Sequence, residues 1–541
     1  MNKLSGILAL LLLVGSTTLV AQGNNVRLDA QINWGEEYTE PSGSFLSKVV
    51  ATQGEGFYAL REKRVTGLTG ELPNKIYLEY YHNRKMKMLK SREIDLRYKN
   101  KKRQLEEVMM LGGKLYLLTS FHNEAKKKNY LFTQRIDNRS LNLKKDLQMI
   151  GEIDTRGVLR EGSFDYHISR DSQTILVINK LPNKKSEPER FALRVFDDNF
   201  TEQWQKDIHL PYDNQNFSIE EYRVDNAGNV YLLGILYNGN RASYKGRPNY
   251  QYIILSYPAA GAQPQQYKLQ LRDQFITDLT FRIARNGRLV CSGFYSDVGT
   301  ASVKGTYFLQ IDPQTKEVFQ QSLKAFDFDF LLDDYSASRQ RRIRQAEAEG
   351  NLRNEPELYR YSLDDLILRS DGGVVLIAEQ YYVDERSFRD IYTGVFNTNF
   401  YYNYNDIIVV NIRPSGEIEW ATRIPKRQVS TNDGGYYSSY AMSIVRDKIY
   451  FVFNDNRRNY DERNHNNRLY NFNGSNSIIA LAEVSKDGGL EVRPLFNNRE
   501  ASIITRPKVC KQTNKREMVI YGEKGRRYRF AHLEFGRTSR S

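Results

Sequence analysis

Six carboxylates lie in segments of this chain that could hold a catalytic acid and base. They are Asp384, Glu385, Asp390, Asp406, Asp433 and Asp455. Two carboxyl groups on either side of a glycosidic bond can serve as general acid and as nucleophile or base, and their separation decides the outcome. Because the fold sets that separation, the sequence leaves a glycoside-hydrolysing role open.

Other catalytic chemistry lacks the residue patterns that it needs. No Gly-rich phosphate loop precedes a helix, and no His-Glu-x-x-His, Cys-x-x-Cys or Gly-x-Ser-x-Gly motif occurs. Four aspartates crowd residues 327–334, but they lack the glycine turn of a calcium loop and favour an acidic surface. We therefore expect no cofactor, no metal site and no catalytic residue. The histidines are scattered along the chain, at His82, His122, His167, His209, His465 and His532.

A second set of residues suits binding. Tyrosine and phenylalanine are mixed with asparagine, serine, glycine and arginine, as in Phe396–Asn405 and Gly434–Tyr440. This mixture is typical of recognition surfaces, because rigid rings supply contact area and small polar residues supply adaptable hydrogen bonds. For any single tyrosine, packing of one loop on another is the simpler interpretation. The candidate binding residues are Tyr381, Tyr382, Phe396, Phe400, Tyr401, Tyr402, Tyr404, Tyr436, Tyr437, Tyr440, Arg457, Arg458, Tyr460, Tyr470 and Phe472.

A unit that recurs eight times must position these residues. Each unit resolves into four strands, of which the second is an almost continuous apolar run, as expected for a strand buried on both faces. The third strands alternate more, and the fourth carry many charges. This gradient predicts an all-β fold, a β-propeller of eight four-stranded blades, or seven if one unit is misread. A tandem of β-sandwiches is the structural alternative. The second strands begin near Phe57, Leu115, Ile175, Val230, Leu289, Val374, Ile449 and Val519.

The last unit is one strand short, and an orphan strand, Val26–Trp34, precedes the first unit. Trp204 and Trp420 each lie early in a fourth strand, and Trp34 fits the same position. We therefore predict that the N-terminal strand completes the last blade and closes the ring. Closure matters because it removes two open sheet edges.

The long connections follow one rule. Successive strands of a blade run in opposite directions, so the connections between second and third strands, and between one blade and the next, share one face of the ring. The tight turns, such as Asn226–Asn229, belong to the opposite face. We predict one elaborated, function-bearing sector. Its long segments are 327–362, which includes a short helix over Ser338–Asn351 capped by Ser338, and 384–405, 425–439 and 454–476.

The N-terminus predicts export. Lys3, the apolar run Ile7–Val14 and the small residues before Gln22 are typical of a signal peptide over residues 1–21, which leaves 22–541 as one propeller domain. No later segment is long and apolar enough for a transmembrane helix. Cys291 and Cys510 fall in distant units, so we expect no disulfide. The net charge of +14 comes from dispersed basic clusters, and nucleic acid is not an expected partner of an exported protein.

One stretch carries a resemblance. The runs Asp406–Ile412, Gly416–Trp420, Ile424–Gln428 and Asp433–Tyr440 resemble uncharacterised exported proteins of Bacteroidota. That family supplies no catalytic residues. The resemblance implies a protein of the periplasm or one attached to an outer-membrane complex, because the last strand runs close to Ser541 and leaves no room for a separate sorting domain.

These observations favour a non-catalytic exported propeller. We expect its Tyr/Asn-rich sector to bind another protein, as a scaffold or interaction subunit of an outer-membrane complex. The alternative is a carbohydrate-binding or glycoside-hydrolysing propeller, because aromatic rings that stack on sugars would explain the same sector.

Overall fold

The computed structural model describes residues 30–536, apart from 64–74, 158–160, 183–186, 240–242, 245, 262, 272, 316, 334, 353–354, 390–395 and 462–468. The predicted signal peptide, residues 1–21, lies outside the described residues, as do residues 26–29 of the predicted first strand. The described chain is almost entirely antiparallel β-sheet. No described helix combines the length and the apolar character that crossing a membrane requires.

The first four sheets each contain four strands in consecutive order from the inside of the ring to its rim. Sheet 1 contains β2 (Ser44–Gln53), β3 (Gly56–Lys63), β4 (Lys75–His82) and β5 (Met88–Asp95). Sheet 2 contains β6 (Gln104–Leu111), β7 (Lys114–Asn123), β8 (Lys128–Ile136) and β9 (Leu143–Asp154). Sheet 3 contains β10 (Ser163–Ile168), β11 (Thr174–Lys180), β12 (Pro188–Asp197) and β13 (Glu202–Asp213). Sheet 4 contains β14 (Phe217–Val224), β15 (Val230–Tyr237), β18 (Tyr250–Tyr257) and β19 (Gln265–Leu269).

The later sheets keep this order and gain additions. Sheet 5 contains β20 (Phe275–Ile283), β21 (Leu289–Ser296), β23 (Gly305–Asp312) and β24 (Glu317–Ala325). Sheet 6 contains β26 (Tyr361–Leu368), β27 (Val374–Arg389), β28 (Phe396–Ile412), β29 (Ile418–Ile424) and the added β30 (Gln428–Thr431). Sheet 7 contains β31 (Tyr440–Val445), β32 (Lys448–Asp455), β33 (Ile478–Val484) and β34 (Leu490–Asn497). Sheet 8 contains β35 (Ile504–Thr505), β36 (Lys511–Asn514), β37 (Glu517–Lys524), β38 (Arg527–Phe535) and β1 (Ala30–Thr39).

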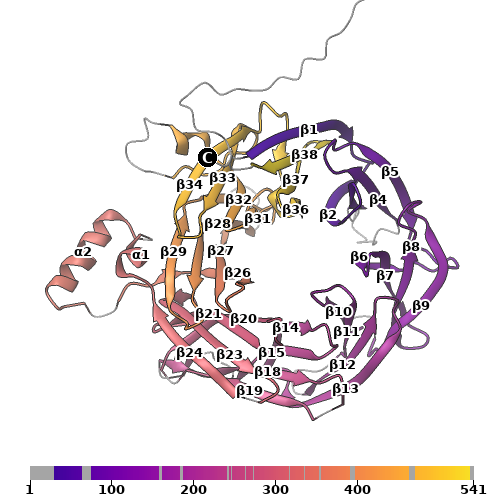
Figure 1. The fold of residues 1–541 in the computed structure, drawn as a ribbon, viewed down its shortest axis with the longest axis horizontal. Helices are drawn as coiled ribbons and strands as arrows, with labels where there is room; N and C mark the ends of the chain where they lie inside the picture. The colour runs from indigo at the N-terminus through magenta and orange to yellow at the C-terminus, as the bar shows by residue number, and fades with distance from the viewer. Residues whose placement is uncertain are drawn as a thin grey trace, which may run out of the picture.

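Short elements occupy the connections between these strands. Two helices, α1 (Phe328–Leu332) and α2 (Ala337–Ala348), lie between sheets 5 and 6, and α2 stands outside the ring with no buried residue (Figure 1). The residue that precedes α2 is Ser336, which makes no side-chain cap, so the predicted cap at Ser338 is wrong. The other short elements are β16 (Ser243–Tyr244), β17 (Arg247–Pro248), β22 (Ser302–Val303), β25 (Leu358–Tyr359), η1 (Arg457–Tyr460), η2 (Gly474–Asn476) and η3 (Pro507–Val509).

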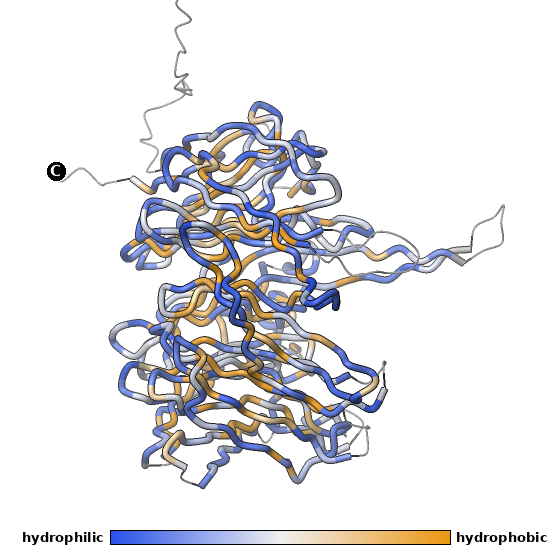
Figure 2. Tube along the Cα trace, turned by 90° about the vertical axis from the view of Figure 1, so that its right-hand side faces the viewer, coloured by the Kyte–Doolittle hydropathy of each residue, from blue (hydrophilic) through white to orange (hydrophobic). Residues whose placement is uncertain are grey.

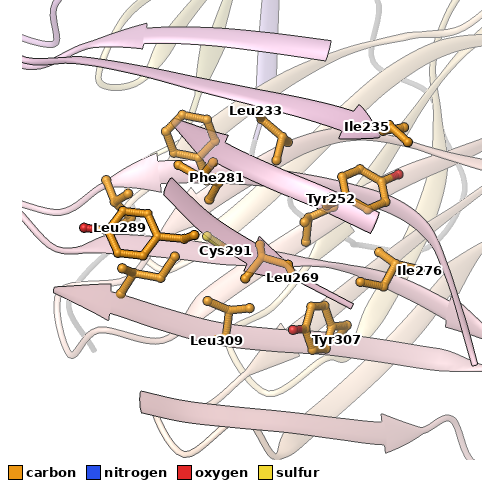
Figure 3. Close-up of a cluster of buried hydrophobic side chains, with 14 of the residues drawn as sticks. Leu233, Ile235, Tyr252, Leu269, Ile276, Phe281, Leu289, Cys291, Tyr307 and Leu309 are labelled. Atoms are coloured by element: carbon orange, nitrogen blue, oxygen red, sulfur yellow. The ribbon is translucent and has the colours of Figure 1, made fainter. Parts of the chain in front are cut away.

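The sheets stand around a common axis and form a β-propeller, as the sequence predicts (Figure 1). A cluster of buried hydrophobic side chains fills each space between neighbouring sheets, from the space between sheets 1 and 2 round to that between sheets 8 and 1. Figure 3 shows one cluster, in which Leu233 and Tyr252 of sheet 4 meet Phe281 and Leu309 of sheet 5. Burial on both faces explains why the second strand of each sheet contains a long apolar run.

The N-terminal strand closes the ring, as predicted. β1 pairs antiparallel with β38, so Trp34 lies opposite Ala531, in the outermost position of sheet 8. Trp34 packs edge-to-face on Phe496 of sheet 7, with ring centroids 5.1 Å apart. The other two tryptophans also lie in outermost strands, and each indole N–H donates to a backbone oxygen of the next sheet: Trp204 to Gly228 (3.0 Å) and Trp420 to Lys486 (2.8 Å).

A buried ionic cluster lies at the seam between sheets 8 and 1. Arg61 is fully buried, donates to Glu79 (3.0 Å) and Glu40 (2.9 Å), and lies 3.7 Å from the ring centroid of Tyr528. Tyr521 donates to Glu40 from sheet 8 (2.9 Å). Because Glu40 follows β1 directly, the cluster joins the closing strand to both of the sheets that it links.

The ring has two distinct faces. We call the face that carries the second-to-third and sheet-to-sheet connections the insertion face, and the opposite face, with tight turns such as Asp225–Asn229 and Ala284–Arg288, the turn face. On the insertion face, connections from different places in the sequence meet: β22 pairs with β25, and β30 pairs with β28. The two cysteines, in sheets 5 and 8, are free thiols.

Candidate functional site

The most prominent feature of the insertion face is a long β-hairpin. Strands β27 and β28 remain paired from Tyr381–Tyr404 out to Arg389–Phe396, beyond the point where β26 ends its pairing at Gln380. Figure 2 shows this hairpin standing out from the ring. We call residues 381–404 the arm. The segment 384–405 is therefore mostly strand, although the sequence suggested a loop.

The two faces of the arm differ in chemistry, because residues opposite one another in an antiparallel pair share a face. One face presents Tyr381, Val383 and Phe400, whose exposed fractions are 38%, 37% and 39%. On the other face, Arg360 lies 5.2 Å from the ring of Tyr382, and Arg386 lies 4.8 Å from the ring of Tyr401. The arm therefore has an exposed aromatic face and a face covered by guanidinium groups.

The base of the arm is tied to sheet 8. The ring of Tyr404 lies 4.6 Å from that of Tyr381, and the Nζ of Lys508 donates to the Tyr404 hydroxyl (2.8 Å). Lys508 also lies 4.1 Å from the centre of the Tyr404 ring. Burial lowers the pKa of Lys508, which Glu379 partly offsets. A β-carbon on Gly435 would come within 2.2 Å of the Tyr404 ring, so this contact requires glycine.

A buried ion pair lies beneath the arm. Lys426 is 1% exposed, and its Nζ donates to Glu379 (2.6 Å) and to the backbone oxygen of Tyr404 (2.9 Å). The second carboxylate oxygen of Glu379 accepts from the hydroxyl of Ser439 (2.8 Å). Lys426 and Ser439 belong to the connection between sheets 6 and 7, so the pair fixes this connection against the arm.

A carboxyl with an unusual pKa lies close to this pair. Asp364, on the innermost strand β26, accepts a hydrogen bond from the hydroxyl of Tyr440 (2.7 Å). Desolvation raises the pKa of Asp364 to about 7, and the charge of Glu379 adds to the rise. Burial also raises the pKa of Asp278 on the adjacent strand β20. Carboxyls with a raised pKa are common at catalytic and ligand-binding sites.

The loop of sheet 7 is held by a second buried carboxyl. Asp455 accepts hydrogen bonds from Asn459 (2.7 Å) and from the hydroxyl of Tyr460 (2.9 Å). Burial raises the pKa of Asp455 to about 6 and raises that of Tyr460 as well. The Oδ1 of Asn459 also accepts from the backbone N–H of Tyr470 (2.7 Å). These tyrosines pack and anchor the loop.

Two further tyrosines face the seam. The guanidinium of Arg506 lies 3.9 Å from the ring centre of Tyr436, and Tyr436 packs edge-to-face on Tyr437 at 4.9 Å. Tyr437 donates to Glu523 of sheet 8 (3.4 Å). The segment Gly434–Tyr440 thus contacts the last sheet.

The predicted binding residues occupy three kinds of position. Those exposed are Tyr381, Phe400, Arg457 and Arg458; those half-buried are Tyr382, Tyr401, Tyr402, Tyr436, Tyr437, Tyr440, Tyr460, Tyr470 and Phe472; Tyr404 is buried. The side chain of Phe396 lies outside the described residues. The arm brings the first group together only in part, because Arg457 and Arg458 belong to η1 of sheet 7.

The predicted carboxylates are dispersed. Asp455 is enclosed by its loop, Asp406 accepts from the backbone of Lys426 (2.9 Å), and Asp384 lies 3.8 Å from Arg360. Asp433 accepts from Ser430 and Gly435. Asp390 lies outside the described residues. Glu385 is exposed on the arm, and the other four described members are each engaged with a different neighbour.

Sequence reasoning missed Asp364, Glu379, Lys426 and Lys508, whose partners come from separate sheets. One signal was available for Asp364. An acidic pair recurs on three innermost strands, as Glu106–Glu107, Glu220–Glu221 and Asp364–Asp365, each at a β-bulge. A repeated acidic pair where a strand would otherwise be apolar marks the inner wall of the ring.

Comparison with known proteins adds the following. No protein-family model matches the chain, and no curated protein matches its sequence. Among solved structures, the β-propeller domain of the Trilobed protease from Pyrococcus furiosus is 11% identical over 73% of this chain and 95% of that chain, with a TM-score of 0.32. A protein of unknown function from Bacteroides caccae is 10% identical over 65% of this chain and 90% of that chain, with a TM-score of 0.27.

Prolyl oligopeptidase B from Galerina marginata is 8% identical over 90% of this chain and 55% of that chain, with a TM-score of 0.37. Likenesses this low decide nothing about activity. The assignment of the fold rests on the sheet topology.

Proposed function

We propose that this protein is an exported, non-catalytic scaffold that binds an extended segment of another protein along the free edge of the arm. One observation carries the proposal: β27 continues to Arg389 after its inner neighbour β26 has ended, so one edge of β27 has no strand beside it in the described chain. An extended peptide can add to such an edge through backbone hydrogen bonds, while its side chains select the fit.

The chain itself uses the other edge in this way. β30 lies along β28, with Tyr401 opposite Thr431 and Tyr404 opposite Gln428. The arm therefore already pairs with one short strand, β30, which comes from the connection between sheets 6 and 7. A partner strand on β27 would extend the same sheet by one.

The aromatic face supplies the side-chain contacts for such a strand. Tyr381, Val383 and Phe400 offer apolar area next to the free edge, which a partner segment with alternating apolar residues would cover. Asp384, Glu385 and Arg386 place charges along the same edge, and charges of this kind keep edge strands of identical copies apart. These features favour a different protein as the occupant, and we place it in a complex at the outer membrane.

The test shortens the arm without disturbing β30. Joining Asp384 to Tyr401 through Asn-Gly keeps the observed register, because these residues face each other and a two-residue turn suits a hairpin. The wild type purified from its native membrane fraction in mild detergent should carry a stoichiometric partner, and the shortened variant should lose it. Val383→Glu should weaken the complex, and the matched control Leu89→Glu, on an exposed outer strand, should not.

A photo-crosslinker at position 383 gives the contact directly. It should capture the same partner, whereas a crosslinker at position 89 should not. The proposal is contradicted if the wild type is recovered only as a free monomer, or if crosslinkers at positions 383 and 89 capture the partner equally.

Sugar binding is the second candidate, because the exposed rings of Tyr381 and Phe400 could stack on a glycan. A glycan array with the wild type and with Tyr381→Ala separates the two. A glycan signal that this substitution abolishes, without any protein partner, would favour the sugar.

A further inference from the structure

The turn face holds a cavity that the proposed docking function does not use. It has a volume of about 910 Å³ and is lined by sheets 3 to 6. Its walls come from the ends of the innermost strands and from the tight turns that follow them, such as Asp225–Asn229 and Ala284–Gly287. A cavity of this size matches sites for small organic molecules.

Three neighbouring sheets place a nitrogen-bearing side chain at one equivalent position in this cavity. The same place in the first strand of sheets 3, 4 and 5 is occupied by His167, Arg223 and Arg282. The next residue along each strand pairs with the first residue of the apolar run in the second strand, which is Ile175, Val230 or Leu289. His167, Arg223 and Arg282 themselves pair in the ladder with Leu176, Tyr231 and Val290. The corresponding position of sheet 6 is Ile367, so this row of nitrogen-bearing side chains does not continue into sheet 6.

Contacts between sheets hold this row in place. Arg282 donates to Asp365 of sheet 6 (2.6 Å) and to Glu221 of sheet 4 (3.3 Å), and Arg223 also pairs with Glu221. The Nδ1 of His167 accepts the backbone N–H of Val224 (3.2 Å). Burial and the two arginines lower the pKa of His167 to about 4, so this imidazole is neutral at physiological pH.

Donors remain available after these contacts are counted. Arg170 and Arg285, on the turns of sheets 3 and 5, line the cavity, are exposed, and have no ion-pair partner among the described residues. The side-chain oxygens of Asn226 and Asn286 accept backbone N–H groups, of Asp171 (3.3 Å) and Arg288 (3.2 Å), which leaves their NH₂ groups as donors.

The one carboxylate on the lining, Asp225, is already used. It accepts the backbone N–H groups of Ala227 (2.9 Å) and Asn229 (2.8 Å) and the amide of Asn229 (2.7 Å). Its charge is therefore compensated within the turn, and the groups that still face the cavity are mainly donors and cations. Ile168, Ile283, Leu366 and Leu368 form an apolar part of the wall.

We infer that this cavity binds a small organic anion, with a phosphate or carboxylate group held by Arg170 and Arg285 and an apolar body against Ile283 and Leu366. Guanidinium groups suit this task because they hold phosphate and carboxylate oxygens through paired, charge-assisted hydrogen bonds. The fixed Arg223–Glu221–Arg282–Asp365 chain keeps the floor of the site rigid, so little order is lost on binding.

Isothermal titration calorimetry with the full chain tests the inference. Phenyl phosphate and benzoate carry the two anionic groups on the same ring, benzyl alcohol is the neutral counterpart, and inorganic phosphate lacks the apolar body. One of the two aromatic anions should bind with at least about tenfold higher affinity than both benzyl alcohol and inorganic phosphate. Which of the two binds more tightly identifies the head group.

The double variant Arg170→Gln/Arg285→Gln should weaken that binding by about tenfold or more. The matched control is Arg139→Gln, an exposed arginine on a turn-face turn of sheet 2 outside the cavity. Thermal melting of each variant confirms that it folds. The inference is overturned if neither anion binds at millimolar concentration, if benzyl alcohol binds as tightly, or if the double variant retains full affinity.

Discussion

The two faces of the ring use charged side chains differently. On the insertion face, Lys426 and Glu379 are buried and paired, and the hydroxyls of Tyr440 and Tyr460 are bound to carboxyls of the same face. On the turn face, Arg170 and Arg285 border a cavity and have no ionic partner in the described chain. Long insertions need internal contacts to become ordered, and those contacts consume polar groups.

The length of a loop and the availability of its side chains are therefore separate properties. Most of the aromatic residues that mark the insertion face are engaged with neighbouring segments, and the arm is the part that stays accessible. The turn face, whose connections are short, keeps donors free because acceptors such as the carboxylates of Asp225 and Asp312 hold its turns.

Removal of the buried lysine should have the largest effect. Lys426→Met leaves Glu379 without its cation in a buried site, which should lower the free energy of unfolding by about 3–5 kcal/mol. Urea unfolding measures this loss. The double variant Lys426→Met/Glu379→Gln should recover part of it, and an equal loss in the double variant would show that the ion pair does not dominate.

Replacement of Asp455 should remove part of the pH dependence of the free energy of unfolding. The folded protein binds this proton with a pKa of about 6, above the ordinary value near 4, so the wild type loses stability as the pH rises from about 4 to about 6. Asp455→Asn does not titrate, and relative to the wild type it should gain up to about 3 kcal/mol over this range. Urea unfolding at each end of the range measures the gain.

Asp312 on the turn face gives a control of opposite sign. Backbone N–H groups of Gln314 and Thr315 lower the pKa of Asp312, so its charged form stabilises the fold above the ordinary aspartate pKa. Asp312→Asn should therefore lose stability relative to the wild type at neutral pH, and this difference should vanish in acid. If Asp455→Asn and Asp312→Asn changed the free energy of unfolding in the same direction at neutral pH, the contrast between the two faces would be contradicted.

Two adjacent glycines separate backbone strain from packing. Gly434 and Gly435 have φ values of 68° and 66°, but only Gly435 has a side chain within reach of an added β-carbon. Gly434→Ala should cost about 1 kcal/mol, and Gly435→Ala about 2 kcal/mol or more, because the ring of Tyr404 must also move. Equal melting temperatures for the two variants would contradict the close contact.

The smallest effect is expected on the turn face. Arg285→Gln should change the free energy of unfolding by less than about 0.5 kcal/mol, because Arg285 is exposed and has no ion pair among the described residues. A loss comparable to that of Lys426→Met would mean that the cavity arginines serve the fold.

Much of the fold was predictable because it depends on local patterns. The apolar second strands begin within two residues of the predicted positions, as at Val230, Leu289 and Val374. The closing strand was also predictable, since Trp34 repeats the position of Trp204 and Trp420. These signals recur in each unit, so a single sequence contains several copies of the evidence.

The arm and the cavity were harder to predict. Asparagine is depleted in strands, so Phe396–Asn405 suggested a loop, although aromatic and polar residues alternate there as in a strand exposed on both faces. The cavity joins His167, Arg223 and Arg282 from three sheets, and no short motif contains them. Their recurrence at one position of successive units is visible only after the strands are aligned.

The seam also bears on how the chain reaches its final form. β1 needs β38 as its partner, and almost the whole described chain separates them. Any fragment that lacks either strand leaves the last sheet unfinished and Arg61 without part of its cluster. Only polypeptides synthesised through to β38 can therefore pair their terminal strand edges. Shorter products expose an unpaired edge and remain open to proteolysis or aggregation.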